Sequence, residues 1–454
     1  MSHGAPGQPP AEVPFREALR FWFKLGLISF GGPAGQIAIM HRELVERRRW
    51  ISEQRFLHAL NFCMLLPGPE AQQLATYLGW LMHKTRGGIA AGTLFVLPSL
   101  LLLILLSWIY MAWGTQPLVA GLFYGIKPAV AAIVLHALHR IGRKALGDPR
   151  RLPLPWLLAV GSFVALAFLH LPFPAVVLSA LLIGWGVSRW APQALGAGGS
   201  GHAAHQAAGA SALIDDHTLP PAHARFSRGR LLRVLAVTGL LWLLPMAVLL
   251  FSQGWNATLT QMGWFFTKAA LLTFGGAYAV LPYVQQAAVD HYGWLSTPQM
   301  MDGLALGEPT PGPLIMVVAF VGFVGGWLQQ VLGPDAQFMG AALAACVATW
   351  FTFLPSFLFI LAGGPWVEST RGRPMVTVPL AAVTCAVVGV IAQLALWFLS
   401  AVVLPGGVLA LPDLWALALV LAAAWALWRL GWSVLRVIAV AAGAGLLLRL
   451  MGWA

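Results

Sequence analysis

Thr273-Phe274-Gly275-Gly276 interrupts one apolar segment of this chain, and Pro311-Gly312-Pro313 interrupts the next. The same two features occur 244 residues earlier, as Ser29-Phe30-Gly31-Gly32 and as Pro67-Gly68-Pro69. Residues 24–69 align with the later stretch without a gap, and chance rarely produces an unbroken match of that length. The chain is therefore an internal duplication, and each copy carries two broken apolar segments.

The duplication extends to both sides of the breaks. Lys24 aligns with Lys268 at the same offset, and farther along the chain the offset becomes 257. There Leu97-Pro98-Ser99 aligns with Leu354-Pro355-Ser356, so the plain apolar segments after the breaks belong to the repeat as well.

The composition indicates a polytopic membrane protein. Of the 454 residues, 59% are hydrophobic and 9% are charged, which leaves too few polar groups to cover a soluble globule. Many apolar runs are about 20 residues long, enough to cross roughly 30 Å of hydrocarbon. Residues 152–171, 231–251 and 376–403 are examples.

A formal net charge of +12 invites a nucleic-acid partner, but the placement of the charges excludes one. The basic residues lie in short loops between apolar spans, which is the pattern of cytoplasmic loops in membrane proteins. The three cysteines, Cys63, Cys346 and Cys385, stand singly in apolar stretches without metal-ligand spacing. We interpret them as packing residues.

The fold class that we predict is an all-α polytopic membrane protein with two homologous halves. Each half contains two broken segments and four plain spans. The predicted divisions are a disordered lead (1–14), a first repeat (15–190), a flexible cytoplasmic linker (191–230), one extra span (231–251) and a second repeat (252–454).

The distribution of Lys and Arg predicts the topology. If each broken segment enters and returns on one side, every basic loop of the first half lies inside, as the positive-inside rule requires. This gives nine full crossings and four re-entrant hairpins, with a cytoplasmic N-terminus and a periplasmic C-terminus. The unpaired span makes the halves inverted repeats, as in many secondary transporters. The alternative is that the broken segments cross the membrane as kinked helices.

The breaks predict an anion site. Gly-Gly and Pro-Gly-Pro both interrupt a helix, and each break exposes the N-terminus of the half-helix that follows, where free N–H groups favour a negative ligand. Ser29 and Thr273, just before the breaks, could donate hydroxyl groups to an oxyanion. The side-chain amides that could add N–H donors are those of Gln36, Gln72 and Gln73. Alternatively, the Ser and Thr hydroxyls bond their own helix backbone.

Five ionisable residues near or inside apolar segments are candidates for a role in the site. Lys127 lies within a span, and the matched Lys24 and Lys268 precede the Gly-Gly breaks; these could supply positive potential or extend to the interface. Glu70 follows the first Pro-Gly-Pro and Glu308 precedes the second. A carboxylate there could exchange protons, or Glu70 could serve only as a helix cap.

These residues also resemble the motifs of the chromate ion transporter (CHR) family. Residues 30–37 are similar to its leading motif, and Trp50-Ile51-Ser52 followed by residues 66–75 is similar to its second. Residues 273–278 and 307–313 are similar to the paired copy, and the resemblance covers nearly the whole chain. The departure is a long His-bearing linker.

The resemblance implies a two-domain bacterial member that exports chromate across the inner membrane, driven by the proton motive force. It implies no cofactor, resident metal or catalytic residue, and a homodimer is one arrangement that remains open. The breaks and the resemblance together assign substrate binding to Ser29, Gly31, Gly32, Gln36, Pro67, Gly68, Pro69, Gln72, Gln73, Thr273, Gly275, Gly276, Tyr278, Pro311, Gly312 and Pro313, and charge or coupling roles to Lys24, Glu70, Lys127, Lys268 and Glu308.

Three other functions remain as alternatives. One is a carrier of sulfate or another small anion, because helix N-termini recognise charge and shape more than the central atom of an oxyanion. A second is a passive anion channel. A membrane-embedded enzyme is the third, although the chain contains no Gly-x-Ser-x-Gly or His-Glu-x-x-His motif.

Overall fold

The computed structural model describes residues 13–29, 32–114, 116–150, 152–195, 212–215, 222–224, 226–274, 277–365, 374–405 and 411–452. These residues are almost entirely helical, and the one β-bridge among them joins Ile51 to Ile214. An all-α polytopic fold is thereby confirmed, since several of the helices are also long and apolar enough to cross a membrane.

The helices of the first half are interrupted where the sequence predicts. They are α1 (Phe15–Ile28), α2 (Gly32–His41), the π-helix η1 (Arg42–Arg47), α3 (Glu53–Leu65), α4 (Glu70–Trp113), α5 (Pro117–Ala145), α6 (Pro153–Ala167) and α7 (Phe173–Trp190). Within α4 the backbone is non-helical at His83 and Lys84, so residues before and after this point form separate rods.

The second half repeats this order after the extra helix α8 (Arg228–Gln253). Its helices are α9 (Thr258–Leu272), α10 (Ala277–Gln285), the π-helix η4 (Gln286–His291), α11 (Thr297–Gly307), η5 (Leu314–Met316), α12 (Val317–Leu328), η6 (Pro334–Ala336), α13 (Gln337–Gly363), α14 (Pro374–Val403), α15 (Leu414–Trp428) and α16 (Val434–Leu450). Ser52 and Ser296 cap α3 and α11 in the same way.

Six helical segments of the described chain meet the length and hydropathy expected of a membrane span. They are Glu70–Trp113, Pro117–Ala145, Phe173–Trp190, Arg228–Gln253, Pro334–Gly363 and Val378–Val403. Helices α6 and α15 are apolar but have only 15 residues each, about 22 Å at 1.5 Å per residue. The protein is a multi-pass membrane protein, and the count of nine crossings stays a prediction.

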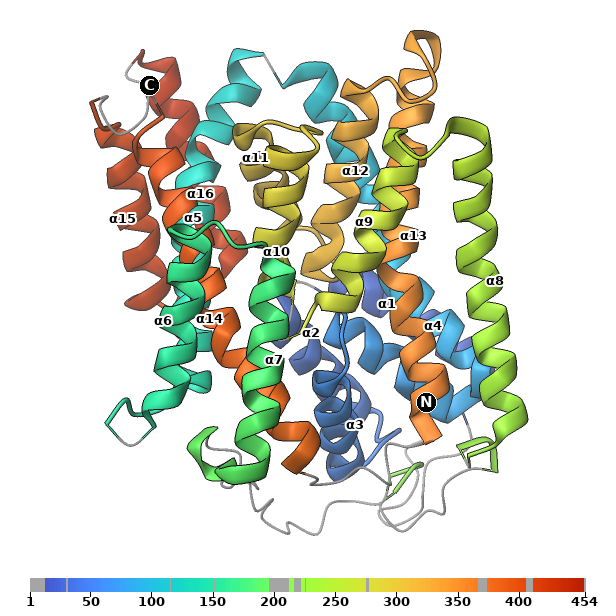
Figure 1. Ribbon diagram of the computed structural model, residues 1–454. Coiled ribbons are helices and arrows are strands. Elements are labelled where there is room, and N and C mark those ends of the chain that lie inside the picture. Colours follow the sequence, from blue (N-terminus) through green and yellow to red (C-terminus); the bar gives the residue numbers. More distant parts are fainter. Residues whose placement is uncertain are drawn as a thin grey trace.

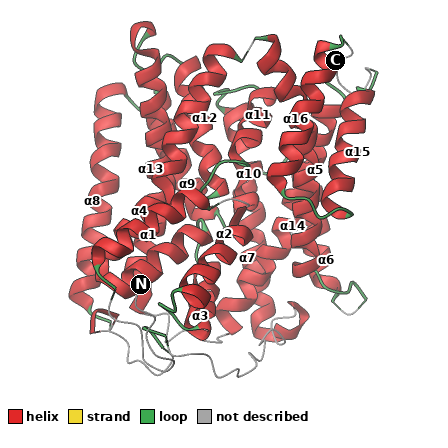
Figure 2. Ribbon diagram, turned by 180° about the vertical axis from the view of Figure 1, so that it is seen from behind, coloured by secondary structure: helices red, strands yellow, loops and turns green. Residues whose placement is uncertain are grey.

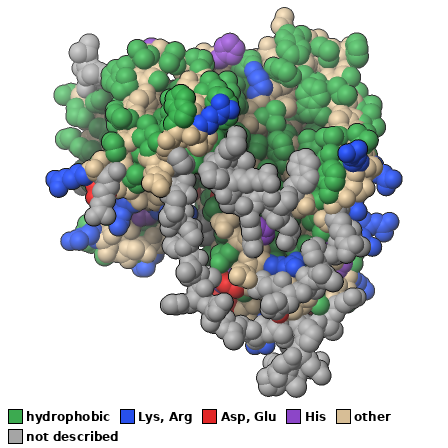
Figure 3. All heavy atoms as spheres, turned by 60° about the horizontal axis from the view of Figure 1, so that its bottom comes forward, with side chains coloured by type: hydrophobic (Ala, Val, Ile, Leu, Met, Phe, Trp, Pro, Cys, Tyr) green, Lys and Arg blue, Asp and Glu red, His purple; other side chains and the backbone are tan. Residues whose placement is uncertain are grey.

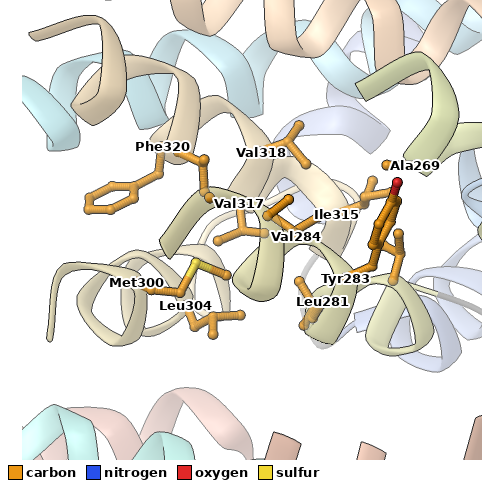
Figure 4. Close-up of a cluster of buried hydrophobic side chains, with 14 of the residues drawn as sticks. Ala269, Leu281, Tyr283, Val284, Met300, Leu304, Ile315, Val317, Val318 and Phe320 are labelled. Carbon is orange, nitrogen blue, oxygen red and sulfur yellow. The ribbon is translucent and has the colours of Figure 1, made fainter. Parts of the chain in front are cut away.

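The broken segments of the two halves lie toward opposite ends of the molecule. Helices α1–α3 occupy the lower part and α9–α12 the upper part, and the same arrangement is visible from behind (Figures 1 and 2). The bottom face carries Lys and Arg side chains, whereas hydrophobic side chains cover the flank above it (Figure 3). The largest hydrophobic cluster lies around α10, α11 and α12, where Val317 and Phe320 pack with Val284 and Met300 (Figure 4).

Two described parts of the predicted flexible linker contact the first half. Ile214 is hydrogen-bonded to Trp50, and the ring of His223 contacts the Trp80 ring and bonds the Trp80 carbonyl at 2.9 Å. Burial against Trp80 lowers the pKa of His223. Aromatic and backbone partners near the bottom of the first half therefore fix two points of the linker. The other predicted linker histidines, and the lead up to residue 12, lie outside the described residues.

Candidate anion-binding site

The two Pro-Gly-Pro breaks have a backbone that only glycine adopts easily. Gly68 has φ of 122° and Gly312 has φ of 111°, where a side chain would strain the chain. In both cases the flanking prolines cannot continue a helix, so the incoming helix ends and a new one starts at Glu70 or at Leu314.

Hydrogen bonds cross between the halves at these glycines. The Gly68 N–H donates to the Thr273 carbonyl at 2.7 Å, and the Gly312 N–H donates to the Ser29 carbonyl at 2.8 Å. The two bonds join the same pair of positions, once in each direction, under the 244-residue offset. The Pro-Gly-Pro break of each half is therefore held against the Gly-Gly break of the other half.

A buried serine lies behind each of these glycines. A Cβ added to Gly68 would lie 2.4 Å from the Ser356 Oγ, and one added to Gly312 would lie 2.6 Å from the Ser99 Cβ. Both serines are fully buried. Sequence reasoning assigned them to the repeat but not to the site, although a matched Pro-Ser in two otherwise apolar segments was an available signal.

The hydroxyl groups of Ser29 and Thr273 do not point to a ligand. The Ser29 Oγ donates to the Leu25 carbonyl and the Thr273 Oγ1 donates to the Ala269 carbonyl, each at 2.6 Å. Each hydroxyl has one hydrogen, so neither can also donate to an oxyanion. Of the two alternatives, the geometry favours hydroxyls that bond the ends of their own helices.

The three predicted glutamines all lie at the breaks and are buried. The Gln36 Nε2 donates to the Gly312 carbonyl and, at 3.4 Å, to the Ser29 carbonyl, so it bridges the two halves. The Gln73 Nε2 donates to the Pro67 carbonyl at 2.7 Å and to the Ser356 Oγ at 3.4 Å. In this arrangement the N–H groups of both amides are directed to protein acceptors at the breaks.

Gln72 keeps donor capacity. Its Nε2 donates to the Thr76 Oγ1 at 3.0 Å, which leaves one amide N–H for a ligand. Four buried polar atoms around the breaks have no hydrogen-bond partner within the described chain: the Oε1 atoms of Gln36, Gln72 and Gln73, and the Ser99 Oγ. The three amide oxygens only accept hydrogen bonds, so a donor such as water would satisfy them, whereas the Ser99 hydroxyl could donate to an anion.

The Gly-Gly breaks are described only in part. Phe30, Gly31, Gly275 and Gly276 lie outside the described residues, so the predictions for Gly31, Gly275 and Gly276 are not examined by the geometry. Gly32 has φ of 68°, and a Cβ added there would meet no atom of the described residues within 4 Å. The side of α2 that starts at Gly32 is therefore not covered by any described residue.

The predicted carboxyl groups, those of Glu70 and Glu308, have different surroundings. The Glu308 Oε1 accepts a hydrogen bond from the Tyr278 hydroxyl at 2.8 Å, and both side chains are buried. Glu70 is the first residue of α4 and is partly buried. Its side chain makes no hydrogen bond or ion pair with any residue that the structure describes, although its charge is favourable at a helix N-terminus.

The matched lysines are not directed into the breaks. Lys24 is exposed, and the Lys268 Nζ lies 5.8 Å from the ring centre of Trp264, a cation–π contact. Of the two alternatives, the structure favours side chains that extend along the helix surface.

Lys127 lies in a separate charged cavity of about 340 Å³, toward the upper end of the molecule. Its Nζ is 3.3 Å from the Asp302 Oδ1, and the Asp302 Oδ2 accepts a hydrogen bond from the Tyr110 hydroxyl at 2.8 Å. Arg449 also lines this cavity, close enough to Tyr124 to interact with it electrostatically. Asp302 and Arg449 were not foreseen, because neither belongs to a motif.

A comparison with known protein families agrees with the duplication seen in the sequence. The family model described as chromate transporter matches residues 16–185 and 260–446, two stretches that correspond to the two repeats. No solved structure matches.

Three relatives are named for the same activity. The chromate transport protein of Pseudomonas aeruginosa is 33% identical over 395 residues, 84% of this chain and 80% of the relative. That of Cupriavidus metallidurans is 30% identical over 382 residues, 83% and 80% of the two chains. A probable chromate transport protein of Synechococcus elongatus is 30% identical over 380 residues, 83% and 82%.

Proposed function

The chain belongs to the chromate transporter family, and from this membership we propose that it is a secondary active transporter that exports chromate across the bacterial inner membrane. The relatives are named as transport proteins and not as enzymes. The observation that supports the proposal is the pair of crossed hydrogen bonds, Gly68 to Thr273 and Gly312 to Ser29, which holds each Pro-Gly-Pro break against the Gly-Gly break of the other half.

The proposed site lies where the half-helices begin. The first-turn N–H groups of α2, α4 and α10 and those following Gly312 have no partner within their own helices, and a dianion would accept from them. The free amide N–H of Gln72 adds a further donor. The remaining residues of the breaks hold this backbone in place and do not contact the anion.

We infer that the two halves are inverted repeats with re-entrant broken segments. The crossed hydrogen bonds relate matched positions reciprocally, as a pseudo-twofold axis requires. The placement of α1–α3 below and α9–α12 above supports the same inference (Figure 1). The basic bottom face in Figure 3 is then cytoplasmic, the C-terminus is periplasmic, and the two ends of the site open alternately.

Glu70 is the carboxyl group that we assign to a proton step. It lies at the start of α4 beside the site and has no hydrogen-bond partner in the described chain, whereas Glu308 is held by Tyr278. A proton that binds Glu70 would remove a negative charge next to the oxyanion. Movement of chromate would thereby become coupled to the proton gradient.

Lys127 and Arg449 would act at the periplasmic end. Both cations line the upper cavity, where Asp302 offsets one of the two charges. The carboxylate of Asp413 lies next to this cavity through its hydrogen bond with Tyr124, so Arg449 rather than a net positive charge would be the group that attracts an oxyanion.

Chromate accumulation tests the function. Cells that express the protein are compared with cells that do not, with and without an uncoupler, and with excess sulfate. Driven export predicts lower chromate in expressing cells, a difference that disappears on uncoupling and is unaffected by sulfate. Raised chromate, or an effect that sulfate removes, would replace the proposal with a sulfate-type carrier. A difference that follows only the concentration gradient would indicate a channel.

A further inference from the structure

An apolar groove of about 610 Å³ runs between α4, α8 and α13, away from the breaks. Its walls include Ile89 and Val96 of α4, Val237 of α8, and Phe353 and Phe357 of α13. From Thr85 to Leu100 the lining of α4 extends about 22 Å at 1.5 Å per residue. One leaflet contributes roughly 15 Å of hydrocarbon, so the groove can accommodate the full depth of an acyl chain.

The groove exists because α8 is attached to the rest of the molecule along only part of its length. The Trp242 indole donates to the Thr267 Oγ1 at 2.9 Å, and the Trp350 indole donates to the Leu241 carbonyl at 3.1 Å. These contacts hold the middle of α8 against α9 and α13. Toward its N-terminal, lower end α8 stands at the outer edge of the molecule (Figures 1 and 2).

Two arginines lie at the lower mouth of this groove. Arg230 and Arg233 are both among its lining residues, and none of the described lining residues is acidic. Arg233 is exposed and makes no hydrogen bond or ion pair with any residue of the described chain. Arg230 donates to the His223 carbonyl, which holds its guanidinium at the mouth. The groove thus joins a positive entrance to an apolar interior.

We propose that this groove binds one anionic phospholipid, with its phosphate on Arg233 and Arg230 and an acyl chain between α4, α8 and α13. Guanidinium groups bind phosphate through several charge-assisted hydrogen bonds. Basic grooves between membrane helices on the positive side of a protein suit such headgroups. The bound lipid completes the packing of α8, the helix that joins the two halves of the transporter.

Cys346 differs from the other two cysteines in its exposure. It was expected to be a packing residue, as Cys63 and Cys385 are, but it is exposed and lines the groove. Its thiol therefore faces the acyl chain of the proposed lipid.

The test measures phospholipid bound to the full-length protein purified in detergent, by native mass spectrometry, with added phosphatidylglycerol or phosphatidylcholine. Arg233→Gln should weaken phosphatidylglycerol binding about fivefold, and Arg230→Gln/Arg233→Gln about 30-fold, at about a factor of five for each basic residue. Arg228→Gln is the matched control, because Arg228 is exposed on the same turns of α8 but does not line the groove. Val237→Trp fills the groove and should also reduce binding.

The proposal predicts retained phosphatidylglycerol in the wild type and in Arg228→Gln, and losses in the other three variants, each eluting as the wild type does in gel filtration. Equal retention of phosphatidylcholine would overturn it, because the charge would then have no role. Unchanged binding in both Arg230→Gln/Arg233→Gln and Val237→Trp would also overturn it. So would a wild type that retains no phospholipid, as expected if a segment of the chain occupies the groove.

Discussion

The backbones of the two halves are nearly the same at the breaks. Ser29 has φ and ψ of −82° and 77°, and Thr273 has −79° and 84°. The π-helices η1 and η4 begin and end at matched positions, and the residues that follow them, Arg48 and Tyr292, share φ of −94°. This geometry is set by glycine and proline, which both halves retain.

The side chains around the matched backbone differ. The π-helix η1 of the first half carries ion pairs such as Arg47–Glu43 at 2.6 Å. In the second half, just after η4, the rings of Tyr292 and Trp294 stack with their centres 4.5 Å apart. The buried pair Lys127–Asp302 likewise has no copy, since its counterparts are Thr384 and His58. The comparison shows that the halves share the backbone geometry of the breaks but not the side chains around them: Gln72, for example, has Met316 as its counterpart.

The largest effect is expected from valine at the matched glycines. Gly68→Val and Gly312→Val each place a branched side chain at positive φ and against a buried serine. Chromate export by either variant should fall below about a tenth of the wild-type rate, at a cost of more than about 1.4 kcal/mol. Gly443→Val is the control, because a Cβ there meets no atom of the described chain within 4 Å. Loss of chromate export in only one of the two variants would contradict the expectation that both breaks are needed.

Breaking the Lys127–Asp302 ion pair, which has no matched copy, should lower stability much more than a change at the counterpart position of Lys127. Lys127→Ala leaves the Asp302 carboxylate buried without its cation and should lower the free energy of unfolding by about 3 kcal/mol. The double variant Lys127→Met/Asp302→Leu should recover most of this loss. Thr384→Ala, at the counterpart position, should cost about 0.5 kcal/mol. Thermal unfolding in detergent measures all three, and equal losses at Lys127 and Thr384 would contradict the comparison.

Replacing the two serines behind the breaks, Ser99 and Ser356, should change the free energy of unfolding by smaller and unequal amounts. Ser356 accepts a hydrogen bond from Gln73, whereas the Ser99 hydroxyl has no partner in the described chain. Ser356→Ala should therefore cost about 1 kcal/mol of unfolding free energy and Ser99→Ala close to none. If Ser99→Ala instead weakens chromate binding without loss of stability, its hydroxyl contacts the anion and the site gains a donor.

The smallest effect concerns the turns after the π-helices. Arg49 has φ of 52° and its counterpart Gly293 has φ of 61°. Gly293→Ala should cost about 1 kcal/mol, because a Cβ is unfavourable in this region. Arg49→Gly should change stability by less than about 0.5 kcal/mol, since relief of strain is offset by unfolded-state entropy. Chemical unfolding of the two variants gives both values, and opposite rankings would show that the turns are not equivalent.

The position of the breaks could be predicted from the sequence, because Gly and Pro act on the backbone locally. The backbone breaks at Gly68 and Gly312, where the Pro-Gly-Pro motifs predict, and one family model matches two stretches of the chain that correspond to the duplication. The conserved offset also anticipated matched geometry at Ser29 and Thr273.

The partners of polar side chains could not be predicted in the same way. Gln36 bonds the Gly312 carbonyl, 276 residues away, so its donors are used by a contact that exists only after folding. The hydroxyls of Ser29 and Thr273 could bond either a ligand or their own helix, and composition does not decide between these. Asp302 was missed because its counterpart is a histidine, which hid it from a search for repeated residues.

Chromate binding to the purified protein tests whether the breaks form the anion site. Equilibrium binding of chromate is compared between the wild type, Gly312→Ala and the control Gly443→Ala. The account predicts that Gly312→Ala weakens binding at least about tenfold, because its Cβ displaces Ser99 and the crossed hydrogen bond to Ser29, while Gly443→Ala binds as the wild type does. Equal affinity in all three proteins would show that chromate binds elsewhere and that the breaks are not its site.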